Sequence, residues 1–164
     1  MEQYQKGLTL IELMMIFAAI GILTTIAIPP AYQAYEDSIA REQVAEAVNL
    51  LDNIKAPIGA FYAENKRWPT KAEFDNLVGM QTGKYVATLV PKILPDGFQV
   101  TATFKSSGVS AGLLKDGTGR TLVMATADGV KWICNDNTDA AGGVPGLTAG
   151  TVLPQHRPSV CNKA

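Results

Sequence analysis

The sequence predicts an α+β protein in which a long N-terminal α-helix packs on a roughly four-stranded antiparallel β-sheet. Three patterns support this prediction: helical spacing of apolar residues at 31–62, strict alternation at 98–104 and a hairpin pattern at 122–134. A helix with one apolar stripe and a sheet with one apolar face bury those surfaces by packing together. We therefore expect a globular head over residues 31–164, preceded by a separate apolar segment.

Composition limits the function classes. With 164 residues the chain is long enough for one domain with its own core. It carries 14 basic and 15 acidic residues, for a formal net charge of -1. This balance gives no bulk attraction to nucleic acid. Hydrophobic residues make up 47% of the chain and are concentrated near its start, which indicates a membrane segment joined to a soluble head.

The apolar segment runs from Leu8 to Ile28 and reads LTLIELMMIFAAIGILTTIAI, with Glu12 as its one charged residue. At ~1.5 Å per residue, a helix of this length spans roughly 30 Å, the thickness of a bilayer's hydrocarbon core. A secretory signal would have a small-residue cleavage site after the apolar run, and none follows here. The sequence therefore predicts a retained membrane helix, and Lys6 favours a cytoplasmic N-terminus.

Glu12 is unusual because a carboxylate inside a membrane span costs about 2.5–3.5 kcal/mol. The segment holds no Lys, Arg or His that could pair with it. A partner would have to come from another chain, or from the amine at the start of this chain or of a neighbour. The alternative is a glutamate that extends to the membrane interface, and the residues alone leave both interpretations open.

Two helices are predicted in the head. The first, from Ala31 to about Tyr62, has an apolar stripe, and Pro57 should kink it or end it early. In the second, Thr70 and Glu73 fit a capping box, which predicts a short helix over residues 71–77. Gly and Thr residues at 79–83 break the helical pattern after it. The stripe of the first helix consists of Ala40, Val44, Ala47, Val48, Leu51, Ile54, Ile58 and Phe61.

Four strands are predicted in the later half of the chain. Apolar residues alternate with polar ones from Phe98 to Phe104. A second strand covers Leu122 to Thr126, a turn at residues 127–129 follows, and Val130 to Cys134 returns as a third strand. A fourth strand runs from Tyr85 to Val90 and is ended by Pro91.

The two cysteines, Cys134 and Cys161, lie late in the chain in loop-rich surroundings. With His156 as the one histidine, they fall short of the four ligands that structural zinc takes. A disulfide, and hence an oxidising compartment, is the simpler interpretation, and two unpaired buried thiols are the alternative. We expect neither a metal site nor a cofactor.

The N-terminal region resembles a known family signature. A Lys-Gly pair followed by LTLIELMMIFAAIGILTTIAIPPAYQAY is similar to the start of type IV pilins, which have a short basic leader ending in Gly and then a (F/L)TLIEL sequence. The resemblance implies that residues 1–7 are a leader, which prepilin peptidase removes by cleaving between Gly7 and Leu8. It further implies N-methylation of Leu8, and pairing of Glu12 with the new α-amine of an adjacent subunit.

The resemblance also has consequences for the rest of the chain. Residues 8–30 would form the membrane and filament-core helix, continuous with the head helix. Pro29 and Pro30 stand where the family has one proline, so we expect a kink or a short melted stretch there; a plain boundary between membrane helix and head is the alternative.

At the C-terminal end, the family carries a disulfide-bonded loop. The stretch GVKWIC resembles the strand with its first cysteine, and Cys134 and Cys161 would close this loop. We expect His156 and Arg157 to be exposed in it.

The function that the resemblance implies is structural. The chain would wait in the inner membrane and then polymerise into an extracellular filament on the bacterial surface, used for adhesion, twitching motility or DNA uptake. Its partners would be further copies of itself, prepilin peptidase, the assembly platform and motor ATPases.

Two other functions are weighed against this one: a minor pilin that recognises DNA or a surface, and a pseudopilin of type II secretion. Direct nucleic-acid binding is not expected, because the head's basic residues are scattered among its strands. These residues are Lys84, Lys92, Lys105, Lys115, Arg120 and Lys131. Catalysis is not expected either: Ser159 lies near His156 in the sequence, but nothing supplies the pocket and the orienting group that a nucleophile–base pair needs.

Overall fold

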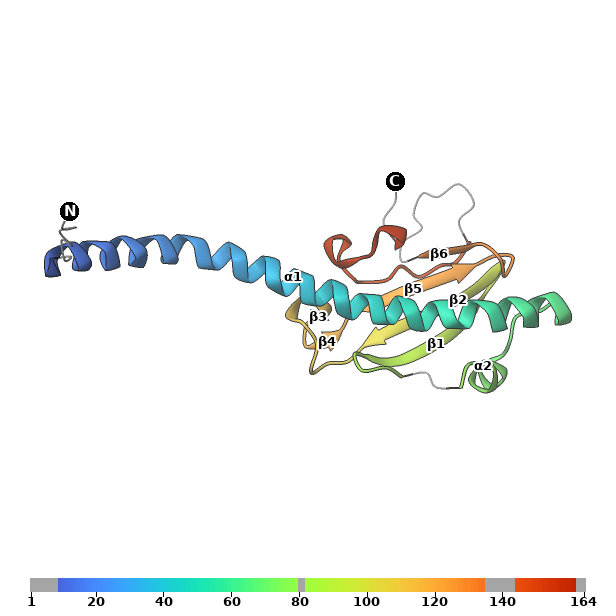
Figure 1. Ribbon diagram of the computed structural model, residues 1–164. Helices are drawn as coiled ribbons and strands as arrows, with labels where there is room; N and C mark the ends of the chain where they lie inside the picture. Colours follow the sequence, from blue (N-terminus) through green and yellow to red (C-terminus); the bar gives the residue numbers. More distant parts are fainter. Residues whose placement is uncertain (1–8, 80–81, 135–143, 162–164) are drawn as a thin grey trace, which may run out of the picture. The chain divides into compact units, whose positions relative to one another are not determined.

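The computed structural model describes residues 9–79, 82–134 and 144–161, apart from the side chains of residues 26–31 and 160. The chain divides into two compact units, Met1–Tyr35 and Glu36–Ala164, which we call the stem and the head. Helix α1 (Leu10–Asn65) contributes to both units (Figure 1). Each unit is described by itself below.

In the described part of the head, α1 packs on a four-stranded antiparallel sheet with strand order β1-β2-β5-β6. This arrangement confirms the predicted α+β fold (Figure 1). Consecutive strands are neighbours throughout, and each pairs with the next in antiparallel register. The strands are β1 (Val86–Leu94), β2 (Gly97–Phe104), β5 (Thr121–Thr126) and β6 (Trp132–Cys134).

The core of the head lies between α1 and the inner face of the sheet. Every predicted stripe residue of α1 from Ala40 to Ile58 is buried, whereas Phe61 is partly exposed near the end of the helix. The alternating residues of β2 face this stripe and are likewise buried. Burying each large apolar side chain contributes about 1.5–3 kcal/mol, so this layer supplies most of the head's stability. The facing residues of β2 are Phe98, Val100, Ala102 and Phe104.

Pro57 was predicted to kink or end its helix and Pro91 to end its strand, and both elements continue past the proline. Helix α1 runs past Pro57 to Asn65, because the buried side chains of Ile54 and Ile58 hold the helix against the sheet on both sides of the proline. Strand β1 runs past Pro91, which pairs with Val100 of β2. Because β1 is an edge strand, one of its sides lacks a neighbour, and a proline is tolerated there without breaking a ladder.

Helix α2 (Lys71–Val78) confirms the predicted short helix and its capping box. The Glu73 backbone N–H donates to the Thr70 hydroxyl, and the Thr70 backbone N–H donates to the Glu73 carboxylate at 2.9 Å. Arg67 also binds this carboxylate, with one guanidinium nitrogen at 2.8 Å. The hydrogen bonds from Arg67 and then Thr70 lower the pKa of Glu73 to about 2. Gly79 ends the helix with φ 67°, a backbone conformation that favours glycine.

The turn between β5 and β6 is longer than predicted, so that β6 begins at Trp132 rather than at Val130. The backbone N–H groups of Val130 and Lys131 donate to the Asp128 carboxylate at 2.8 and 2.7 Å. These bonds satisfy the turn's backbone and lower the pKa of Asp128. Because Asp128 takes up both donors, the two residues serve the turn instead of extending the strand.

Several short elements were not predicted. A small hairpin joins β3 (Leu114–Lys115) to β4 (Thr118–Gly119), after the 3-10 turn η1 (Ala111–Leu113). Two further 3-10 turns, η2 (Pro154–His156) and η3 (Ser159–Cys161), lie near the C-terminus. Each has only two or three residues, too few to show a periodic pattern.

We call the segment 144–161 the C-terminal strap, and its first part, residues 144–148, lies on the outer face of the sheet. Val144 packs against Leu94 and Ala125, and the buried side chain of Gln99 accepts a bond from the Thr148 N–H at 3.0 Å. This part of the strap therefore covers some of the sheet face that α1 leaves open, whereas Val152 and Cys161 further along belong to the core on the α1 side.

Candidate assembly surface

The N-terminal end of α1 is capped by a side chain. The Glu12 backbone N–H donates to the Thr9 hydroxyl at 3.3 Å, and the Leu13 N–H donates to the Thr9 carbonyl at 3.2 Å. The Thr9 hydroxyl thus satisfies one donor that the first turn of a helix leaves open, and the Thr9 carbonyl accepts a regular bond of the helix. Glu12 lies in this first turn, where the helix dipole favours a negative charge.

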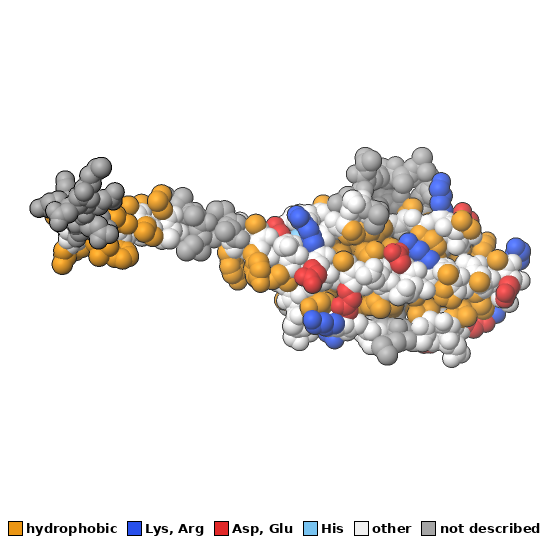
Figure 2. All heavy atoms as spheres, in the orientation of Figure 1, with side chains coloured by type: hydrophobic (Ala, Val, Ile, Leu, Met, Phe, Trp, Pro, Cys, Tyr) orange, Lys and Arg blue, Asp and Glu red, His pale blue; other side chains and the backbone are white. Residues whose placement is uncertain are grey.

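The stem exposes a continuous apolar surface. Its large hydrophobic side chains are between 44% and 76% exposed, and Figure 2 shows them along the stem. Soluble monomers rarely expose so many contiguous apolar groups, and such surfaces mark contacts with other molecules. The residues are Leu10, Ile11, Leu13, Met14, Met15, Ile16, Phe17, Ile20, Ile22 and Leu23.

The polar groups of the stem divide into two kinds. The hydroxyls of Thr24 and Thr25 donate to carbonyls of their own helix, at 2.9 and 2.7 Å, so they need no outside partner. Glu12 is the one charged side chain within residues 9–25, it is exposed, and no side chain among the described residues pairs with it. Within residues 9–25, the stem therefore presents a single carboxylate on a largely apolar surface.

Three other predictions for the N-terminal region are not tested by the described residues: leader cleavage, N-methylation and the proline kink. Gly7 and Leu8 lie outside the described residues, so leader cleavage and N-methylation remain predictions. The backbone of α1 is helical through Pro29 and Pro30, and the predicted kink there stays a prediction.

Among the described residues, no helix combines the length and the apolar character needed to cross a membrane.

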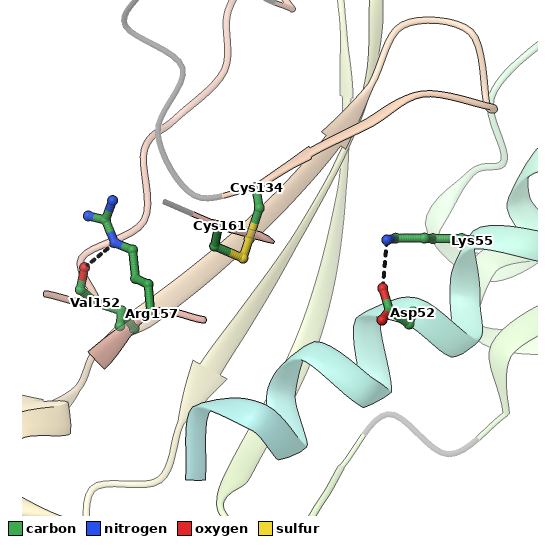
Figure 3. The surroundings of a disulfide bond; sticks show 6 residues. All are labelled: Asp52, Lys55, Cys134, Val152, Arg157 and Cys161. Carbon is green, nitrogen blue, oxygen red and sulfur yellow. Dashed lines mark hydrogen bonds and ion pairs between the residues drawn. A yellow bond between two sulfur atoms is a disulfide. The ribbon is translucent and has the colours of Figure 1, made fainter. Parts of the chain in front are cut away.

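The two cysteines form a disulfide, Cys134–Cys161, with their Cα atoms 4.9 Å apart. Cys134 is the last residue of β6 and Cys161 the last residue of η3, so the bond fastens the end of the strap to the sheet (Figure 3). In the chain-entropy model, a crosslink closing a loop of this length stabilises the fold by roughly 3–4 kcal/mol. The unpaired-thiol alternative is wrong.

The predicted exposure of His156 is also wrong. Its side chain is 2% exposed, and its Nε2 lies 2.8 Å from Oδ1 of Asp37 on α1. Arg157 is partly buried, and its Nε donates to the Val152 carbonyl at 2.9 Å (Figure 3). Both residues hold the strap in place, so neither presents the free side chain expected of a recognition loop.

The basic residues of the head are largely engaged in bonds within the head. Lys92 donates to Thr148, and Lys105 donates to the Lys84 carbonyl. Arg120 donates to the carbonyls of both Gly112 and Thr151. The Lys84 ammonium lies 4.9 Å from the Tyr85 ring centroid, and a hydrogen bond with Tyr85 raises the pKa of Lys84.

These contacts tie the strap, β1 and η1 together and serve the fold. Within the described residues, no group of three or more His, Cys, Asp or Glu side chains could hold a metal ion.

The fold and the exposed stem are those of a filament subunit, and two family models match the chain. One, described as "Pilin (bacterial filament)", matches residues 40–162, and the other, the prokaryotic N-terminal methylation motif, matches residues 3–28. The chain belongs to the pilin family.

Relatives with assigned names support the same family. The fimbrial protein EcpC of Eikenella corrodens is 38% identical over 143 residues, which cover 85% of this chain and 88% of the relative. The type IV major pilin PilE1 of Neisseria gonorrhoeae is 34% identical over 100% of this chain and 91% of its own length. The type IV major fimbrial protein FimA of Dichelobacter nodosus is 34% identical over 86% of this chain and 92% of its own length.

Proposed function

We propose that the chain is a structural subunit of a type IV pilus and polymerises through its stem into a filament on the bacterial surface. The observation that carries the proposal is the apolar surface from Leu10 to Leu23, which is exposed in the single chain. Packing the stems of many copies side by side would bury this surface and supply the driving force for assembly.

Glu12 sets the register of the packed stems in this proposal. Its carboxylate has no side-chain partner among the described residues, and an unpaired charge inside an apolar bundle is costly. The α-amine of Leu8, freed by leader cleavage, would supply the opposite charge from an adjacent subunit. If a stem were shifted along its neighbours, the Glu12 carboxylate and the Leu8 amine would both be unpaired. The charge pair therefore favours one register.

The precursor state follows from the same residues. Before assembly, the segment Leu8–Ile28 would reside in the inner membrane, with residues 1–7 on the cytoplasmic side. Prepilin peptidase would cleave after Gly7 and methylate Leu8, as the match to the methylation motif suggests. The assembly platform and motor ATPases would then extract the subunit from the membrane. In this process the chain would serve as a structural subunit and not as a catalyst.

The relatives favour a major subunit over the other two functions. Their names include type IV major pilins from Neisseria gonorrhoeae and a type IV major fimbrial protein from Dichelobacter nodosus, and none of those cited is a secretion pseudopilin. A dedicated DNA-binding head is disfavoured because Lys92, Lys105 and Arg120 are used within the head.

The intact mass of the main polypeptide sheared from expressing cells tests the proposal. We expect the mass of Leu8–Ala164 plus one methyl group and minus two hydrogens for the disulfide. A Gly7→Leu variant should yield uncleaved chain in the membrane fraction and no sheared polypeptide. Finding only the uncleaved 164-residue chain from wild-type cells would contradict the proposal.

A further inference from the structure

The C-terminal strap reaches α1 at the point where the helix enters the head. Nε of Arg41 donates to the Gln155 carbonyl at 2.7 Å, and the His156 ring bonds to Asp37 at 2.8 Å. Asp37 and Arg41 are one helical turn apart, so both contacts lie on the same side of α1. The strap thus holds the first two turns of α1 within the head.

A second attachment comes from the loop before η1. The Ser110 hydroxyl lies 3.2 Å from a carboxylate oxygen of Glu36, and the Ser110 N–H donates to the Gln43 side chain at 2.8 Å. Ser110 and Gln43 are both buried. Glu36, the first residue of the head unit, is therefore already bound to the head.

These polar contacts act where apolar packing is weak. Ala40 is the first buried residue of α1 within the head, and residues 36–39 are all exposed or partly exposed. The hydrophobic effect therefore does little to hold residues 36–39 on the sheet. Their attachment depends on the bonds of Glu36, Asp37 and the following turn.

The buried ring of His156 depends on Asp37 for its hydrogen bonding. The ring is buried against η1, where any side chain at position 112 would collide with it. Within the described part of the chain, Nδ1 of His156 has no hydrogen-bond partner, so Asp37 provides the ring's one such bond. Without Asp37, both ring nitrogens would be buried and unsatisfied, which is costly unless the strap moves.

The strap has its own attachments apart from the disulfide. The Thr151 N–H donates to the Thr121 carbonyl at 2.8 Å, and Arg120 donates to the Thr151 carbonyl at 2.9 Å. Gln99 binds Thr148 further along. These bonds lie between 148 and 151 and do not require Cys161 to be oxidised.

We propose that the C-terminal strap is a clamp that fixes the first turns of α1 in the head, so that unwinding or bending of the stem stops at Glu36. The clamp consists of the Asp37–His156 and Arg41–Gln155 contacts, supported by the Glu36–Ser110 contact. It holds with the disulfide reduced as well as oxidised. Its use under tension in a filament rests on the proposed function; the clamp itself does not.

Hydrogen exchange of the full chain in detergent micelles, read by mass spectrometry, tests the clamp. Asp37→Ala should speed exchange about tenfold in peptides covering residues 36–41 and 153–159, while the β2 peptide covering 97–104 keeps its protection. The matched control is Asp52→Ala, an exposed acid on the same helix paired with Lys55 (Figure 3). We expect this control to leave all three peptides unchanged.

Three results would overturn the clamp. One is that Asp37→Ala behaves like Asp52→Ala, and another is that the β2 peptide loses protection equally while the head stays folded. The third is that reduction of the wild-type disulfide alone releases residues 36–41. If Asp37→Ala unfolds the whole head, Arg41→Ala decides by the same criteria, because it removes a strap contact without leaving a buried unpaired group.

Filament counts on cells that express the same variants separate this inference from the proposed function. Wild-type cells without filaments would contradict the proposed function and leave the exchange result standing. Filaments of normal number, together with unchanged exchange in Asp37→Ala, would remove the clamp alone.

Discussion

The stem and the head use one helix in opposite ways. In the stem, the large side chains of α1 from Leu10 to Leu23 are exposed, whereas in the head the stripe from Ala40 to Ile58 is buried against the sheet. The two halves have the same backbone conformation. What differs is that the sheet covers the head half, whereas none of the described residues covers the large side chains from Leu10 to Leu23. A helix of this kind folds with part of its hydrophobic surface reserved for other molecules.

The same contrast applies to charge. In the head, the carboxylates of Asp37, Asp52 and Glu73 pair with His156, Lys55 and Arg67 respectively. In the stem, Glu12 has no side-chain partner among the described residues. Substitutions in the two halves should therefore affect different measurements: filament assembly for the stem, and stability for the head.

The largest effect is expected from Glu12→Ala. Close charge pairs at interfaces are coupled by about 1.5–7 kcal/mol, so losing the carboxylate should reduce filaments at least tenfold. Electron microscopy of sheared fractions gives the count, and immunoblots should show processed subunit at its normal level in the membrane. Met15→Leu, which keeps the apolar surface, serves as the control. Abundant normal filaments in Glu12→Ala would remove the assigned role of Glu12.

Leu51→Ala tests the buried half of the helix. Leu51 is 0% exposed, and truncating a buried leucine costs about 2–5 kcal/mol. Urea unfolding followed by tryptophan fluorescence measures this cost. The matched variant is Leu23→Ala in the stem, where the side chain is 66% exposed, and it should leave the unfolding curve unchanged while reducing filaments. Equal destabilisation by both variants would break the comparison.

A glycine pair gives a smaller contrast. A Cβ at Gly59 would lie 2.7 Å from the Gly129 carbonyl oxygen, so Gly59→Ala forces the β5–β6 turn away from α1. Overpacking of this kind costs about 1–3 kcal/mol, part of which is offset by the helix propensity of alanine. Gly21→Ala in the stem has open space around it and should leave head stability unchanged in the same urea assay. A gain in stability from Gly59→Ala would contradict the close approach.

The smallest effect is expected at Glu73, on the surface of the head. Its folded pKa of about 2 lies below the ordinary value of 4.5, so its contribution is present above pH 4.5 and is lost as pH falls toward 2. Glu73→Gln should flatten this part of the pH dependence of urea stability, with a small change at pH 7 because the site is exposed. An unchanged slope between pH 4.5 and 2 would count against the Arg67 and Thr70 bonds.

Much of the fold could be predicted because its signals are local. The apolar stripe of α1, the Thr70–Glu73 capping box and the alternation in β2 each depend on spacing within one element, and the structure confirms all three. The β3–β4 hairpin also has a local signal, the Asp116-Gly117 pair between its strands. Asp116-Gly117 adopts positive φ at both residues, 51° and 75°, which is the backbone of a tight hairpin turn.

The remaining features depend on tertiary neighbours. The buried ring of His156 has its hydrogen-bond partner in Asp37, 119 positions away in the sequence. No local sequence pattern indicates a partner at that distance. The elements that contain Pro57 and Pro91 also continue because of tertiary context. Core packing holds α1 on both sides of Pro57, and the edge position of β1 accommodates Pro91. Hydropathy alone marked the stem as an apolar segment, but no local pattern indicated the contacts of the strap with residues 36–41 of α1.

Pro91 has a consequence for a crowded filament surface. Exposed edge strands attract the edges of neighbouring molecules, and heads arrayed side by side would meet repeatedly at high local concentration. Pro91 lies in the middle of the edge strand β1 and lacks a backbone donor, so a foreign strand could not add along its full length. The exposed Lys92 beside it adds a charge at the same place. Together they would disfavour strand pairing between neighbouring heads along β1.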